Sequence, residues 1–80
     1  MMEQFKSLDT LDVGCKAIIR KITAQGILRR KLLDMGAIPK SEIEVAKIAP
    51  FGDPIDIKIK GYHLSLRKQE AQGILVEMLT

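Results

Sequence analysis

The sequence predicts a mainly β fold, a small barrel of about five strands with one short amphipathic helix and one further helical turn. Three observations support this: a strict alternation of apolar and polar residues from Ile55 to Leu66, a change to helical periodicity from Ile27 to Met35, and a length of 80 residues. A strand that alternates in this way has one apolar face, which more sheet must cover. At this length the chain makes a single domain, residues 1–80, and a small barrel covers those faces with the least chain.

The first strand is expected to run from Cys15 to Ile22. Within it Ala17 and Ile19 share the face of Cys15, while Lys16, Ile18 and Arg20 share the other. We expect Cys15 to be buried there as a small hydrophobic residue. Residues 1–6 show no such pattern and are expected to be loose, with packing of Phe5 onto the domain as the alternative for that residue.

A helix is predicted over residues 27–35. Its apolar residues, which recur at the i, i+4 and i+7 spacing of an amphipathic helix, are Leu28, Leu32 and Met35. Gly36 follows where a left-handed C-cap falls, and Pro39 blocks any continuation. So short a helix is unstable alone, so it must lie across an open end of the sheet.

The strand expected over Ile43–Ala49 has an irregular alternation. Ile48 is out of phase with Val45. A bulge near Ala46 and Lys47 would restore the pattern, and bulges are common where small barrels bend.

The regular alternation that follows predicts a β-hairpin. Its strands are Ile55–Lys60 and Tyr62–Leu66, joined tightly at Gly61, and the pattern places Tyr62 on the inward face, in the core. The same pattern places His63 on the solvated face. The remaining elements are a helical turn over Arg67–Gln72 and a last strand over Ile74–Leu79.

Five segments of the chain resemble one known family. They are SLDTLDVG at 7–14, LRRKLLDMGAIP at 28–39, APFGDPI at 49–55, IKIKGYHLSLRKQEA at 57–71 and ILVE at 74–77. In this order and spacing they resemble the FeoA family, the small cytoplasmic proteins that accompany FeoB, the membrane GTPase that imports ferrous iron. The resemblance covers nearly the whole chain and implies an SH3-like barrel with a role in ferrous iron uptake. Lys40 departs from it, because the family usually has a second turn glycine there, and this leaves the type of that turn open.

Composition limits the classes of function. The net charge is +3, which permits an anionic partner without requiring one. Cys15 is the only cysteine, so the chain has neither an internal disulfide nor a Cys-x-x-Cys metal site. The sequence lacks a signal-peptide core and an apolar stretch of membrane-spanning length, so we expect a cytoplasmic protein that meets a membrane only through a partner. No phosphate-binding loop or nucleophile elbow is present, and we expect no enzymatic activity.

Two segments are candidates for binding a partner. The first is the loop Ala49–Pro54, where Phe51, Gly52, Asp53 and Pro54 lie together at a tip. Phe51 either folds back over the barrel end or serves as an exposed anchor for a partner. Gly52 and Asp53 also have a structural interpretation, since glycine adopts unusual backbone angles and aspartate accepts bonds from nearby amides.

The second candidate is the basic segment of the predicted helix, Arg29, Arg30 and Lys31. It is either a solvated helix face or a docking surface for an acidic partner.

The resemblance implies that FeoB is the partner, and a protein without a catalytic set can act only by binding. Exposed sheet edges also allow a homo-oligomer. The alternative is a small nucleic-acid-binding barrel, although base stacking needs exposed aromatics and only Phe51 and Tyr62 are candidates. No cofactor is expected; a weak transition-metal site for iron or zinc would need carboxylates such as Asp53, Asp56 or Glu70 besides His63 and Cys15.

Overall fold

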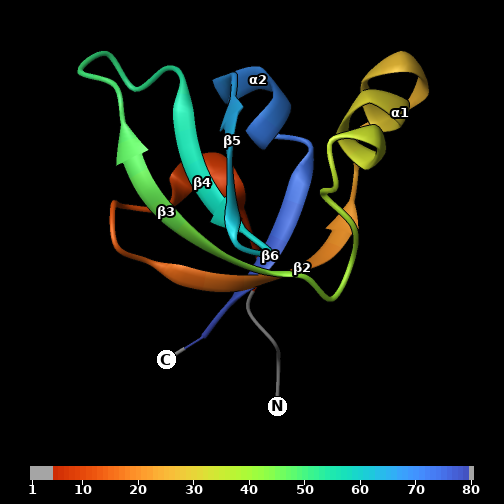
Figure 1. The fold of residues 1–80 in the computed structure, drawn as a ribbon. Coiled ribbons are helices and arrows are strands. Elements are labelled where there is room, and N and C mark those ends of the chain that lie inside the picture. Colours follow the sequence, from red (N-terminus) through yellow and green to blue (C-terminus); the bar gives the residue numbers. More distant parts are fainter. Residues whose placement is uncertain (1–4, 80) are drawn as a thin grey trace.

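The structure, a computed structural model, describes residues 5–79 and confirms the mainly β fold (Figure 1). The elements are β1 (Phe5–Ser7), the 3-10 turn η1 (Leu8–Thr10), β2 (Lys16–Ile22), α1 (Gly26–Asp34), β3 (Glu42–Ile48), β4 (Ile55–Ile59), β5 (Tyr62–Leu66), α2 (Lys68–Ala71) and β6 (Ile74–Met78).

One antiparallel sheet contains all six strands, in the order β1-β6-β2-β3-β4-β5. The sheet curls around a single core, but its hydrogen bonds do not close it, so β1 and β5 are its two edges. Figure 1 shows α1, α2 and the loop between β3 and β4 at the end of the molecule away from the two chain ends.

The expectation of a loose N-terminal segment is wrong for Lys6, Phe5 follows the alternative of lying on the domain, and residues 5–79 form six strands instead of five. Both residues belong to β1, where Phe5 pairs with Glu77 and Lys6 with Val76. Three residues are too few for an alternation to be recognised, and the strand forms because β6 offers it an open edge. The rest of the segment predicted to be loose, residues 1–4, lies outside the described residues.

The core forms where alternation predicts it. Ile55, Ile57 and Ile59 on β4 are almost fully buried. The register of β3 against β4 shifts between Val45 and Lys47, which confirms the predicted bulge. A second bulge, which the pattern did not reveal, lies in β2. Among residues 5–79 the buried apolar side chains are Leu8, Leu11, Ala17, Ile19, Ile22, Leu32, Ala37, Ile43, Val45, Ile55, Ile57, Ile59, Leu66, Ala71, Ile74 and Val76.

The prediction that Tyr62 lies in the core is wrong, because its side chain is 42% exposed. Its hydroxyl donates a hydrogen bond to the backbone carbonyl of Met35, 3.1 Å away. Tyr62 is the first residue of its strand, so its ring reaches past the rim of the core to the end of α1. Gly36 makes this contact possible, since a Cβ there would lie 2.2 Å from the tyrosine hydroxyl.

Two lysines have left-handed backbone conformations. Lys60 and Gly61, with φ of 51° and 84°, form the two-residue turn between β4 and β5, and positive φ at both positions is typical of a type I′ turn. Lys40 has φ of 76°, so the turn that the sequence left open requires a conformation that glycine adopts most easily.

Candidate docking surface

The two predicted docking segments lie at the same end of the molecule. Figure 1 shows the loop between β3 and β4, then α2, then α1 at that end. Side-chain contacts join the three, because Asp53 of the loop and Lys31 of α1 both bind α2. We call residues 49–54 the Phe51 loop.

The Phe51 loop presents a single large apolar side chain. Phe51 is 98% exposed, so it does not fold back over the barrel. The backbone behind it is held by hydrogen bonds from the Gly52 amide to the Ala49 carbonyl (2.7 Å) and from the Ala49 amide to the Pro54 carbonyl (3.1 Å). An aromatic ring on a hydrogen-bonded turn loses little conformational freedom when it binds, which is favourable for an anchor residue.

Gly52 and Asp53 have the structural roles expected of them. Gly52 has φ of 83°, and the Asp53 carboxylate accepts a hydrogen bond from the backbone amide of Lys68, 3.0 Å away, at the first residue of α2. The peptide bond before the half-buried Pro54 is cis. These residues therefore shape the loop and attach it to α2.

Glu70 of α2 is the most buried charged side chain among the described residues, at 6% exposure. Its carboxylate accepts a bond from the Arg67 amide at 2.7 Å and forms an ion pair with Lys31 at 2.5 Å. Burial acts to raise the pKa of Glu70, but the ammonium of Lys31 and the amide of Arg67 outweigh it and hold the pKa below its ordinary value of 4.5. The carboxylate therefore stays charged at neutral pH and ties α1 to α2.

The three basic residues of α1 have different roles. Arg29 donates a hydrogen bond to the Ile22 carbonyl at 2.9 Å, and Lys31 is paired with Glu70. Both therefore fasten α1 to the barrel, while Arg30 is exposed on the helix. Their role as a docking surface stays a prediction.

The sequence did not single out Ile27, which is 89% exposed in the first turn of α1. It lies beside an open hollow of about 390 Å³, mostly apolar, lined by Ile27, Arg30, Lys31, Asp34 and Met35. The signal was present, because Ile27 is out of phase with the buried stripe of Leu28 and Leu32. An apolar residue outside the stripe of an amphipathic helix is a candidate contact residue.

Metal ligands do not gather among residues 5–79: no group of three His, Cys, Asp or Glu side chains could hold an ion there. His63 is exposed, as predicted, and its Nδ1 lies 3.2 Å from a carboxylate oxygen of Asp56. Cys15 packs against the core but is only half-buried. Weak iron or zinc binding stays a prediction.

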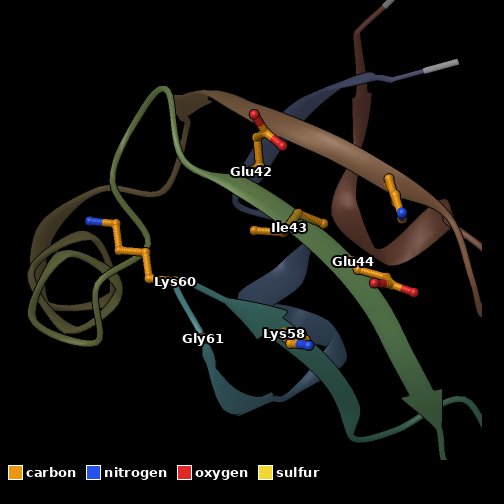
Figure 2. A pocket seen from close by; sticks show the side chains of 7 residues that line it. Glu42, Ile43, Glu44, Lys58, Lys60 and Gly61 are labelled. Atoms are coloured by element: carbon orange, nitrogen blue, oxygen red, sulfur yellow. The ribbon is translucent and has the colours of Figure 1, made fainter.

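The outer face of the sheet is charged rather than apolar. Figure 2 shows Glu42 and Glu44 on β3 beside Lys58 and Lys60 of the next hairpin, around an open hollow of about 250 Å³. Lys16 opposes Glu44, and Glu44 opposes Lys58, so opposite charges alternate across three strands. This face is therefore a solvated one.

None of the helices within residues 5–79 has the length and apolar character to span a bilayer.

The comparisons with known proteins agree with this architecture. A model of the FeoA domain matches residues 6–78. A protein of Porphyromonas gingivalis described as an Fe(2+) transport protein A/Fe(2+) transporter FeoB fusion protein is 34% identical over 73 residues, which are 91% of this chain and 9% of the fusion protein. The chain thus spans only a small part of that relative's length.

Solved structures have the same fold. A FeoA-like protein from Clostridium acetobutylicum is 40% identical, with a TM-score of 0.90 over 100% of this chain and 92% of that one. FeoA of Stenotrophomonas maltophilia in complex with zinc, described as a prokaryotic SH3 domain protein, has a TM-score of 0.73 at 21% identity and covers 90% of this chain and 89% of that one. At that identity the second likeness shows the fold alone, an SH3-like one.

Proposed function

The chain belongs to the FeoA family, and on that premise we propose that it is an accessory protein of ferrous iron uptake that binds the membrane GTPase transporter FeoB on its cytoplasmic side. The observation that supports this most directly is the relative from Porphyromonas gingivalis, in which the two components form one polypeptide. Two domains that are fused in one protein commonly bind each other in organisms that make them as separate chains.

The proposed mode of action is binding. Phe51 inserts into an apolar pocket of the transporter, and burying a phenylalanine side chain contributes about 2–3 kcal/mol. Ile27 and Arg30 form a second contact region on α1. The contacts of Asp53 and Lys31 with α2 support a joint role, because they hold the Phe51 loop and α1 in a fixed relation.

The test is a binding measurement between the purified protein and the cytoplasmic GTPase domain of its cognate FeoB, with and without a GTP analogue, at moderate salt. Binding that depends on the nucleotide would indicate regulation of the GTPase cycle. If the GTPase domain does not bind, full-length FeoB in nanodiscs is tested next. Absence of binding to the full-length transporter would refute the proposal.

The nucleic-acid alternative makes a different prediction in the same assay. A generic oligonucleotide would bind with a steep dependence on salt, because binding releases counterions from the phosphates. We expect no such binding, since the outer face carries carboxylates between its lysines.

A further inference from the structure

The sheet has an accessible edge at β5. Among the described strands β5 pairs only with β4, and it is longer than the other edge strand, β1, with five residues against three. Proteins usually protect such edges with lysine, proline or a bulge. β5, with the sequence YHLSL, has none of these.

The register shows which backbone groups point outward. Ile59 and Tyr62 close the two-residue turn, so this pair and every second pair after it exchange hydrogen bonds. The pairs of His63 with Lys58 and of Ser65 with Asp56 fall between them. The amides and carbonyls of His63 and Ser65 therefore point away from β4, and no backbone hydrogen bond outside the strand ladder uses them within residues 5–79.

The side chains around this edge leave room for another strand. The side chain of His63 is 58% exposed and Ser65 is exposed, while Leu64, on the inner face between them, is only half-buried. A further strand would place residues opposite His63 and Ser65 on the outer face and a residue opposite Leu64 on the inner face.

The charges favour an acidic strand. Lys58 is the last charged residue of the row Lys16, Glu44 and Lys58 across the outer face, and it lies opposite His63 on the edge. Lys60 and Arg67 flank β5 in sequence, whereas Asp56 is already hydrogen-bonded to His63. Cationic side chains thus outnumber carboxylates around His63, so a carboxylate facing this position would be attracted to the edge, and such attraction stabilises strand pairing.

We propose that the edge of β5 binds an extended segment of a partner protein by strand addition, with acidic side chains opposite His63 and Ser65 and an apolar side chain opposite Leu64. Main-chain hydrogen bonds give this site its affinity, and the positive charge at the edge selects the segment. The site is separate from the docking surface proposed for FeoB.

The first experiment measures amide hydrogen exchange of the free protein by NMR. The amides of His63 and Ser65 should exchange much faster than those of Leu64 and Leu66, which point to β4. Equal protection of all four in dilute protein would mean that the edge is already covered, and this would overturn the proposal. Protection of His63 and Ser65 that appears only as protein concentration rises would identify a second copy as the occupant, which also overturns it.

The second experiment titrates the labelled protein with the capped peptide Thr-Glu-Val-Glu-Val-Glu-Thr. Shifts centred on β5, with slower exchange at His63 and Ser65, are expected, and weaker binding at higher salt. The control peptide has lysine in place of each glutamate. Equal binding of the lysine peptide, or no binding of the acidic one, would contradict the proposed selectivity or the site.

Ser65→Pro is the decisive variant. It removes one outward amide without removing a bond to β4, and the ring hinders an added strand, so we expect binding about tenfold weaker. Ser65→Thr is the matched control, since it keeps the amide and suits a strand, and it should bind like the wild type. If Ser65→Pro does not fold, His63→Glu takes its place; it adds a negative charge at the edge and should weaken binding of the acidic peptide severalfold. Unchanged binding in the folded variant would refute strand addition.

Discussion

Some single residues of this protein affect its stability, whereas another is available for binding a partner. Lys40 and Lys60 adopt positive φ, which costs about 1–2 kcal/mol for a residue with a Cβ. Phe51, by contrast, is exposed without backbone strain of its own, so its chemistry is available for binding. Stability and partner binding can therefore be changed separately, one residue at a time.

Lys40→Gly should stabilise the protein. Glycine relieves the left-handed strain, and its greater entropy in the unfolded chain offsets part of the gain, so the free energy of unfolding should rise by about 0.5–1 kcal/mol. Denaturant unfolding measures this. Lys58→Gly, in the middle of a strand, is the control and should lower stability; a similar loss with Lys40→Gly would contradict the role of its φ.

Phe51→Ala should weaken binding to FeoB by about tenfold or more and leave stability unchanged, since the ring contacts so little of its own chain. Binding and thermal unfolding are measured on the same samples. Val13→Ala, an exposed apolar residue (58%) outside the Phe51 loop and α1, is the matched control. Wild-type affinity of Phe51→Ala would remove the loop from the proposed interface.

At the scale of elements, the contacts between α1 and α2 stabilise two helices that are each too short to be stable alone. The nine-residue α1 is fastened by Arg29 and Lys31 and receives the hydroxyl of Tyr62 at its C-terminal end. The four-residue α2 receives Asp53 at its first amide and holds Lys31 through Glu70. Apart from the bond of Arg29 to the nearby Ile22 carbonyl, these contacts join residues that are far apart in sequence.

Glu70→Gln should lower stability at pH 7 by about 1 kcal/mol, because the amide keeps a bond to Arg67 but loses the charge that pairs with the partly exposed Lys31. The pKa of Glu70 is lowered on folding, so its carboxylate contributes stability that is present above pH 4.5 and is lost as pH falls through the folded pKa. Unfolding curves between pH 7 and pH 3 should therefore converge for the two proteins on acidification. A constant difference across this range would show that the ion pair is not the cause.

The elements also show what sequence could predict. The alternation from Ile55 to Leu66 predicted β4 and β5, and the out-of-phase Ile48 predicted the bulge, since both follow from local periodicity. β1 and the exposure of Tyr62 could not be predicted in this way, because they depend on an open edge of β6 and on the distance to Met35. Likewise, no local pattern distinguishes Arg30 from Lys31, whose partner Glu70 lies in another helix.

For the whole molecule, the fold separates its surfaces. The Phe51 loop, α2 and α1 form one end, the outer face of β2, β3 and β4 is a charged and solvated one, and β5 runs along a free edge. A compact domain of 33 × 29 × 24 Å thus carries both of the proposed binding regions, the end and the edge. Variants of one region should leave the other intact, because sites without shared contacts act nearly additively.

The pairing of β1 with β6 sets Phe5 directly opposite Glu77. A polypeptide that enters this domain at β1 therefore leaves it one strand spacing away, about 5 Å. Such a domain can be appended to a larger protein, or inserted into one of its surface loops, without separating the two ends of that loop. The end formed by the Phe51 loop, α2 and α1 would still face outward.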